Sequence, residues 1–217
     1  MLKLANTRPR DCWTPRRCSR PDGSSRRGRP EASGNVDRVA AQADRDLVAS
    51  LIRDVPDFPK PGVVFKDITP LLASPQGYQA AIAALAATAP PDIDVVVGME
   101  ARGFIFAGPV ALQLGAGFVP VRKPGKLPGD VYTQTFSLEY GNETLAVHAD
   151  AIAPGKRVLV IDDVLATGGT VGATAALIRR LGAELVHVSV LIELGFLGGA
   201  AHLASLGIER PSAVVSI

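Results

Sequence analysis

The stretch that decides the fold is VLVIDDVLATGGT, residues 158–170. It begins with four aliphatic residues, continues with Asp162 and Asp163, and ends in a small, glycine-rich turn. A continuous aliphatic run is typical of a strand in a parallel sheet whose two faces are both covered by helices. The two carboxylates then lie at the carboxyl end of that strand, where open α/β sheets bind their ligands.

The residues after this strand predict a helix whose first turn can hold an anion. The helix is expected from Thr170 to Leu181, because a hydroxyl residue opens it and Arg-Arg-Leu-Gly closes it. Its free backbone N–H groups, with Gly168 and Gly169 before them, favour a phosphate. No lysine follows Gly169, which excludes the P-loop motif, and GAGFVP at 115–120 lacks the third glycine of a dinucleotide motif.

The adjacent carboxylates and the anion-binding turn favour opposite ligands. Paired carboxylates repel a phosphate and suit hydroxyl groups or a hydrated Mg²⁺. A ligand with a phosphate at one end and a ribose diol at the other satisfies both features. The alternative is a solvated pair of aspartates at a strand end, followed by an ordinary turn.

This stretch resembles the ribose-phosphate motif of the type I phosphoribosyltransferases, which bind 5-phosphoribosyl 1-pyrophosphate (PRPP). The resemblance implies that Asp162 and Asp163 hold the ribose hydroxyls. It also implies that the following turn holds the 5′-phosphate through Ala166, Thr167, Gly168, Gly169 and Thr170. PRPP synthetases and PRPP-sensing transcriptional regulators carry similar motifs, so the motif by itself leaves these classes open.

Composition predicts one α/β domain preceded by a basic tail. The 217 residues are 47% hydrophobic, enough for one substantial core. Residues 1–35 carry nine Lys or Arg against three Asp or Glu, whereas residues 36–217 carry 14 against 18. The domain therefore has no basic excess that would favour nucleic acid. No apolar run approaches the roughly 18 residues that a membrane span needs.

The tail of residues 1–35 is rich in Arg, Pro, Ser and Gly and is expected to be disordered. It lacks the apolar core of a secretory signal, and its prolines disfavour the amphipathic helix of a transit peptide. A functional tail, and translation from an upstream start codon with the protein beginning near Asn35, both stay open. The two cysteines, Cys12 and Cys18, lie in this tail, so the domain is cysteine-free and a cytoplasmic location is expected.

Periodicity and turn residues predict the elements that surround the motif. Ser74 is expected to cap the second helix, with a proline in its first turn. A long polar stretch predicts a lid near 122–138, and the residues on both sides of Gly141-Asn142 predict a hairpin. Helices are expected at about 37–54, 75–89 and 103–114, and strands at 94–99, 117–121, 158–161, 185–194 and 213–217.

Four further stretches, in this order, resemble the adenine branch of the same family. They are FPKPGVVFKDITPLL at 58–72, EARGFIFAGP at 100–109, VRKPGKLPG at 121–129 and SLEYG at 137–141. The resemblance covers residues 36–217, the expected domain. It implies an α/β, type I phosphoribosyltransferase fold with a parallel core sheet flanked by helices, a small hood built largely from the N-terminal part of the domain, and a flexible lid loop.

In EARGF, Arg102 precedes the helix that starts at Gly103, and the resemblance implies that its guanidinium binds pyrophosphate and takes part in catalysis. The family's loop carries a non-proline cis peptide, which here would join Glu100 to Ala101. The lid would add three cations that meet the pyrophosphate: Arg122, Lys123 and Lys126. From the residues alone, a surface arginine and solvated loop charges are the alternatives.

The resemblance also implies a base pocket. Phe65 would stack on adenine, and the backbone of Val64 and Lys66 would form hydrogen bonds with it. Val164 would cover the other face of the base. The alternative for Val64 and Phe65 is a place in the core. Glu139 is the family's candidate catalytic residue near the purine. Three histidines match no family motif and are assigned structural roles: His148, His187 and His202.

The function that the resemblance implies is transfer of the phosphoribosyl group from PRPP to N9 of adenine, forming AMP and pyrophosphate. Mg²⁺ would be held chiefly by the substrate, without a cluster of protein ligands. A cytoplasmic homodimer with no nucleic-acid or membrane partner is expected. In 6-oxopurine transferases an aspartate usually stands where this chain has Ala166, so proton transfer at the purine would fall to Glu139. A PRPP-sensing regulator and transfer to another base are the rival functions.

Overall fold

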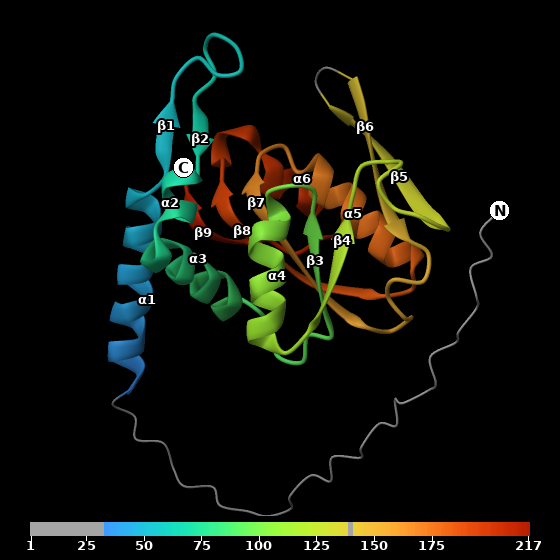
Figure 1. Cartoon of the computed structure of the whole chain (residues 1–217), viewed down its shortest axis with the longest axis horizontal. Helices are drawn as coiled ribbons and strands as arrows, with labels where there is room; N and C mark the ends of the chain where they lie inside the picture. Colours follow the sequence, from blue (N-terminus) through green and yellow to red (C-terminus); the bar gives the residue numbers. More distant parts are fainter. Residues whose placement is uncertain (1–32, 139–140) are drawn as a thin grey trace, which may run out of the picture.

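A computed structural model describes residues 33–138 and 141–217 (Figure 1). Its centre is a five-stranded sheet with strand order β4-β3-β7-β8-β9, in which every neighbouring pair is parallel. This is the parallel core sheet that the sequence predicts. The strands are β3 (Val95–Met99), β4 (Gly117–Val121), β7 (Arg157–Leu165), β8 (Glu184–Glu193) and β9 (Ser212–Ser216).

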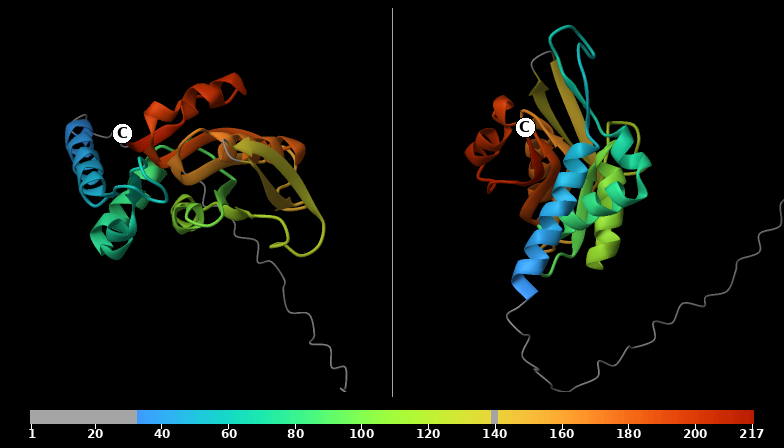
Figure 2. Two further views of the ribbon diagram at one scale, coloured as in Figure 1. Left: turned by 90° about the horizontal axis from the view of Figure 1, so that it is seen from above. Right: turned by 90° about the vertical axis from the view of Figure 1, so that its left-hand side faces the viewer.

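Helices cover both faces of the sheet, as Figure 2 shows from two further directions. They are α1 (Ser33–Ser50), α2 (Thr69–Ala73), α3 (Pro75–Ala87), α4 (Gly103–Leu114), α5 (Gly169–Arg180) and α6 (Gly199–Ser205), with a 3₁₀ turn at Gly195–Leu197. The predicted cap of α3 is confirmed, because Ser74 Oγ accepts a hydrogen bond from Gly77 N at 3.1 Å.

The middle strand, β7, is buried along almost its whole length. Val158 and Val160 pack in the cluster that includes α5, whereas Leu159 and Ile161 pack in the cluster that includes α3 and α4. All four side chains are fully buried. Because both faces of the strand require apolar side chains, its sequence is a continuous aliphatic run.

Two antiparallel hairpins rise beyond the carboxyl end of the sheet (Figure 1). In one, β1 (Arg53–Val55) pairs with β2 (Phe65–Asp67), and in the other, β5 (Val131–Leu138) pairs with β6 (Gly141–His148). The β1–β2 hairpin belongs to the N-terminal part of the domain, from which the hood is expected to be built. Both hairpins flank the edge at which β3 and β7 end, so both can contribute residues to a site there.

The first helix ends at Ser50, not near residue 54 as its periodicity predicts, because the following residues form β1. Two ion pairs hold β1 against β2 across the hairpin: Arg53 with Asp67 at 2.5 Å and Lys66 with Asp54 at 2.7 Å. The partners lie 14 and 12 residues apart in the chain, so a pattern that repeats every three to four residues cannot predict their contact.

The lid loop is shorter than the sequence predicts. β5 begins at Val131, which leaves residues 122–130, and not 122–138, as the loop between β4 and β5. Tyr132 packs against the core, and the guanidinium of Arg180 on α5 lies 4.2 Å from the centre of its ring. The hairpin thus gains contacts with α5 that a polar composition does not suggest.

The predicted β5–β6 hairpin is present, but Leu138 already pairs with Gly141, so β6 begins where the sequence places the turn. Residues 139–140 lie outside the described part of the chain, as do residues 1–32, so the disorder of the tail stays a prediction.

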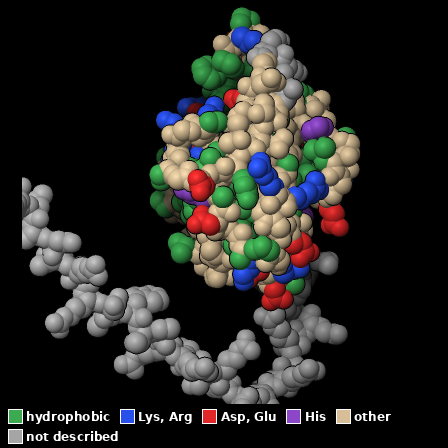
Figure 3. Space-filling model, turned by 90° about the vertical axis from the view of Figure 1, so that its right-hand side faces the viewer, with side chains coloured by type: hydrophobic (Ala, Val, Ile, Leu, Met, Phe, Trp, Pro, Cys, Tyr) green, Lys and Arg blue, Asp and Glu red, His purple; other side chains and the backbone are tan. Residues whose placement is uncertain are grey.

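On the face shown in Figure 3, Lys and Arg side chains are interspersed with Asp and Glu. None of the described helices is both long enough and apolar enough to cross a membrane.

We expect Leu159→Ala to lower the free energy of unfolding by about 2 to 5 kcal/mol, because it opens a cavity at a fully buried position of the central strand. Leu197→Ala is the control, since that leucine is 39% exposed and should cost about 1 kcal/mol or less. Urea unfolding measures both values. Equal losses in the two variants would contradict the central place of β7 in the core.

Candidate active site

The acidic pair lies where β7 extends past its neighbour β3. The two strands pair only as far as Ile161, so Asp162 and Asp163 reach the edge of the sheet, although β7 itself continues to Leu165. The strand is therefore longer than the four aliphatic residues that predict it. The two aspartates are only 8% and 6% exposed. Two adjacent carboxylates are thus shielded from water at the ligand-binding edge of the sheet.

Arg102 stands beside this pair, at the N-terminus of α4. Its Nε lies 2.8 Å from Oδ2 of Asp163, which makes an ion pair between a partly exposed guanidinium and a buried carboxylate. By its angles this contact is not a hydrogen bond, and Oδ2 accepts none from any described residue. The buried oxygen therefore keeps an acceptor position that a ligand hydroxyl can fill.

The two carboxylates are electrostatically unfavourable as they stand. Burial raises the pKa of Asp162 well above its usual range, and the charge of Asp163 raises it further. Burial also raises the pKa of Asp163, while the Arg102 guanidinium acts in the opposite direction. Asp163 N donates to Asp162 Oδ1 at 3.0 Å, which favours the ionised form of Asp162. Hydroxyl groups or a cation supplied by a ligand would relieve the remaining cost.

The start of α4 approaches the acidic pair very closely. A Cβ on Gly103 would lie 2.7 Å from Oδ1 of Asp162, so a larger residue would displace the carboxylate. This contact explains the glycine of the EARGF stretch. The peptide bond between Glu100 and Ala101 is cis, as the family resemblance implies.

Residues 164–171 enclose a cavity of about 140 Å³ at the N-terminus of α5. Gly168 has φ +86°, and a Cβ there would come within 3.0 Å of the Gly199 carbonyl oxygen on α6. The ring of His202 packs behind the same glycine, a neighbour that sequence reasoning missed. A small cavity at the N-terminus of a twelve-residue helix is suited to a phosphate, as the motif predicts.

Phe65 on β2 connects the hood to Arg102. The guanidinium carbon of Arg102 lies 5.4 Å from the centre of the Phe65 ring, and the Phe58 ring meets Phe65 edge to face at 5.2 Å. Val64 is 50% exposed, and neither Val64 nor Phe65 belongs to the buried core, so the alternative that placed them there is wrong. Phe58 is a further aromatic residue that sequence reasoning did not single out.

The other two residues expected in the base pocket are less open. The Nζ of Lys66 is tied to Asp54 across the β1–β2 hairpin, which leaves the Lys66 backbone as its means of binding a base. Val164 is partly buried against the core cluster of α3 and α4 and also lines the cavity of the phosphate turn.

Two of the three lid cations pair with carboxylates. Arg122 Nε lies 3.1 Å from Oε2 of Glu100, and Lys123 Nζ lies 3.4 Å from Oε1 of Glu143. The carbonyl oxygen of Lys126 accepts a hydrogen bond from Arg122 at 3.2 Å. Glu100 is thus a site residue that sequence reasoning missed, although its place two residues before Arg102 is a signal. Glu139 lies outside the described residues.

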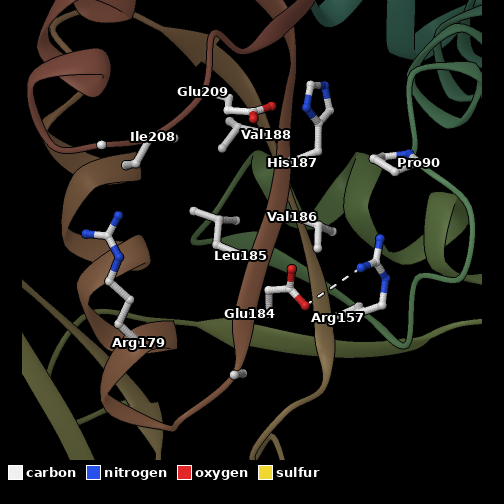
Figure 4. Close-up of a pocket in the computed structure, with 12 residues that line it drawn as sticks. Pro90, Arg157, Arg179, Glu184, Leu185, Val186, His187, Val188, Ile208 and Glu209 are labelled. Carbon is white, nitrogen blue, oxygen red and sulfur yellow. Dashed lines mark ion pairs between the residues drawn. The ribbon is translucent and has the colours of Figure 1, made fainter.

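A larger cavity, of about 550 Å³, lies at the opposite, amino end of β8 (Figure 4). Its two arginines already have partners: Arg157 pairs with Glu184 at 3.7 Å, and Arg179 donates to the Leu206 carbonyl at 3.0 Å. It shares no residue with the acidic pair or the phosphate turn. The carboxyl edge, which combines an anion-binding turn with unsatisfied carboxylates, is therefore the candidate active site.

Comparison with known proteins identifies the family of the chain. Residues 66–200 match the family model described as phosphoribosyl transferase domain. The adenine phosphoribosyltransferase of Cutibacterium acnes is 70% identical over 173 residues, which are 80% of this chain and 98% of that protein. The chain belongs to the adenine phosphoribosyltransferase family.

Crystal structures of adenine phosphoribosyltransferases share its fold. The Thermoanaerobacter pseudethanolicus enzyme superposes with a TM-score of 0.76 at 42% identity, covering 80% of this chain and 99% of that one. The Saccharomyces cerevisiae enzyme, solved as a complex with D-2,5-dideoxy-2,5-imino-altritol 1,6-bisphosphate and adenine, gives 0.72 at 35%, covering 79% and 97%. The predicted fold class and transferase activity are confirmed by this membership.

We expect Asp162→Asn to stabilise the protein at pH 7 and to do so much less at pH 4. The raised pKa means that, above the usual value of about 4, the folded state holds a proton that the unfolded state has lost, so wild-type stability falls as pH rises through this window. Asparagine carries no charge and escapes this loss. Urea unfolding of both proteins at the two pH values measures the difference.

Asp67→Asn is a control of opposite sign. Hydrogen bonds from Thr69, and then the contact with Arg53, lower the pKa of Asp67 to about 2, so its charge stabilises the fold at neutral pH. This variant should lose stability at pH 7. A stabilising effect of Asp162→Asn that is the same at pH 4 and pH 7 would contradict the assigned electrostatics.

Proposed function

We propose that the chain performs the reaction of its family at the carboxyl edge of β3 and β7. The reaction transfers the phosphoribosyl group of PRPP to N9 of adenine and releases AMP and pyrophosphate. The observation that carries the proposal is the buried acidic pair, Asp162 and Asp163, followed within the same β7–α5 connection by the phosphate-sized turn. One ligand with a ribose diol and a 5′-phosphate satisfies both.

The ribose phosphate takes the first part of the site. The 5′-phosphate binds at the N-terminus of α5, through Ala166, Thr167, Gly168, Gly169 and Thr170. The ribose hydroxyls donate to the two aspartates, and the buried Oδ2 of Asp163 gains the hydrogen bond that it lacks.

The pyrophosphate is bound by Arg102 and by cations of the lid, Lys123 and Lys126, with Arg122 beside them. Arg102 is suitably placed because it already touches Asp163, the expected neighbour of the ribose. A guanidinium can bind two phosphate oxygens at once, which fixes the leaving group in position.

Adenine stacks on Phe65, with Val164 toward its other face and the backbone of Val64 and Lys66 at its polar edge. The exposure of Val64 and the contact between Phe65 and Arg102 support this placement. The crystal structures of the Saccharomyces cerevisiae and Giardia lamblia relatives, solved with adenine and 9-deazaadenine respectively, support adenine as the base.

In the reaction, the bond between C1′ and the pyrophosphate oxygen breaks, and pyrophosphate leaves with the electron pair. N9 of adenine forms the new bond to C1′ and loses its proton, for which Glu139 is the proposed acceptor or relay. Catalysis rests mainly on positioning and on charge stabilisation of the leaving group by Arg102. Closure of the lid would exclude water from the electron-poor sugar.

Mg²⁺ is the proposed cofactor, and the residues present fit it in part. Asp162 and Asp163 offer the hard oxygen ligands that Mg²⁺ prefers. The described residues hold no group of three or more His, Cys, Asp or Glu side chains that could bind a metal, so substrate oxygens would complete its coordination. When bound, the ion neutralises part of the pyrophosphate charge.

We also propose a homodimer in the cytoplasm. Leu112 on α4 is 84% exposed and Phe118 on the adjacent β4 is 39% exposed, which supports a protein partner on this face. The cysteine-free sequence of residues 36–217 supports the location. Small-molecule substrates, and neither nucleic acid nor membrane, are the proposed ligands.

The direct test is to incubate the protein with PRPP, Mg²⁺ and each base in turn and to measure nucleotide formation. We expect AMP from adenine, and a kcat/KM for hypoxanthine and guanine lower by up to about 10⁴- to 10⁵-fold, because backbone groups matched to the adenine amine would face an oxygen. Uracil and orotate should be inert. Comparable rates with hypoxanthine would overturn the adenine assignment, and PRPP binding without any nucleotide would favour a PRPP-sensing regulator.

A further inference from the structure

The carboxylate of Glu100 gathers three hydrogen bonds from the first two residues of the lid loop. Oε2 accepts from Lys123 N at 2.9 Å and from Arg122 Nε at 3.1 Å, and Oε1 accepts from Arg122 Nη2 at 3.4 Å. The Glu100 side chain is only 16% exposed, so this is a partly buried clasp and not a solvated surface pair.

Arg122 is anchored on three sides. Its backbone N–H donates to the Ala146 carbonyl on β6 at 2.9 Å, and its own carbonyl accepts from Ala146 N at 2.7 Å. Its Nη1 donates to the Lys126 carbonyl at 3.2 Å, which closes the segment 122–126 into a short turn. Arg122 therefore fixes both ends of the segment that carries the lid cations: its backbone is bonded to Ala146, and its side chain, which Glu100 holds, is bonded to the Lys126 carbonyl.

Glu100 also adjoins the other half of the proposed pyrophosphate site. It directly follows β3, its N–H donates to the Val121 carbonyl at 2.9 Å, and Arg102 comes two residues later. One carboxylate thus connects the Arg102 loop, the exit of β4 and, through Arg122, the β5–β6 hairpin.

A carboxylate in this place needs an explanation, because its charge opposes the binding of an anion. The hydrogen bond from Lys123 N, and then those from Arg122, lower the pKa of Glu100, so the group is ionised at neutral pH. A carboxylate here still favours anion binding if holding the cations in place contributes more to the binding free energy than its repulsion of the anion costs.

We propose that Glu100 is a positioning residue that holds the turn of residues 122–126, with Lys123 and Lys126, in place to bind pyrophosphate opposite Arg102. The proposal rests on the proposed function, because it assumes that pyrophosphate binds between Arg102 and the lid. Glu100 itself acts through Arg122 and the Lys123 backbone and does not touch substrate.

The sign of the effect of Glu100→Gln on pyrophosphate affinity tests the proposal. Glutamine keeps the size of the side chain but loses the charge that holds Arg122. If Glu100 positions the cations, calorimetric titration with Mg²⁺-pyrophosphate should give a Kd roughly tenfold higher than wild type, as expected when a charge-assisted hydrogen bond is weakened. If Glu100 is a bystander, removal of its charge leaves the affinity unchanged or improves it.

Glu143→Gln is the matched control. Glu143 is also paired with a lid cation, Lys123, but its side chain is 43% exposed and their contact is 3.4 Å. The same substitution there should leave pyrophosphate affinity within about twofold of wild type, because exposed pairs contribute little. In addition, Glu100→Gln should weaken pyrophosphate binding less in the Arg122→Gln background than in wild type, since the bonds from Arg122 are already lost there and only the bond from Lys123 N remains.

Steady-state kinetics provide the second readout. Glu100→Gln should raise KM for PRPP while KM for adenine stays near its wild-type value, a split that general damage to the fold would not produce. Should that variant unfold, Arg122→Lys, which cannot make both bonds to Glu100, should show the same split. Equal or tighter pyrophosphate binding by Glu100→Gln overturns the proposal, and so does an equal change in both KM values. Wild-type protein that binds no pyrophosphate overturns both this proposal and the proposed function.

Discussion

The ion pair between Arg102 and Asp163 is the contact on which the arrangement of the site depends. Burial of two adjacent carboxylates at the end of β7 is unfavourable, and the guanidinium 2.8 Å from Asp163 offsets part of that cost. Arg102 can take this position because β3 already ends at Met99 and because Gly103, which has no side chain, lets α4 approach Asp162. The same guanidinium reaches the ring of Phe65 in the hood. One side chain thus joins the sheet, a helix terminus and the β1–β2 hairpin.

The remaining electrostatic cost would be relieved by a ligand that supplies hydroxyl groups or positive charge. Oδ2 of Asp163 is buried without a hydrogen bond from the described residues, and the pKa of Asp162 is raised by burial and by its neighbour. A ribose diol can donate to both groups, and the turn between β7 and α5 is suited to a phosphate. In adenine phosphoribosyltransferases the substrate PRPP carries both features. In the proposed function the lid would add positive charge near the pyrophosphate, and the hydrogen bonds from Arg122 and Lys123 N to Glu100 would keep that charge ordered.

The sequence predicted what is local and periodic in this structure. Three features depend only on residues that are close together in the chain, and they are found where expected. They are the buried strand β7, the Ser74 cap of α3 and the glycine-rich turn before α5. The elements that were missed depend on distant partners. β1 is held by ion pairs of Arg53 and Lys66 with carboxylates that lie 14 and 12 residues away in the chain. On β5, the ring of Tyr132 packs against Arg180 of α5. Glu100 was missed for the same reason, since its partners lie in the loop after β4, 22 and 23 residues further along the chain. The cis peptide and the residues of the base pocket came from family resemblance, because no periodicity encodes them.

Calorimetric titration of PRPP into wild type and Asp163→Asn tests most directly whether the buried acidic pair is the ribose site. If it is, the variant should bind PRPP about 10- to 100-fold more weakly, because it loses a charged acceptor worth about 1.5 to 3 kcal/mol per hydrogen bond. Asp94→Asn, at the amino end of the sheet, should bind PRPP as wild type does. Unchanged or tighter binding by Asp163→Asn would contradict the account, since a carboxylate that accepts hydrogen bonds from the ribose hydroxyls cannot be replaced by an amide without loss of affinity.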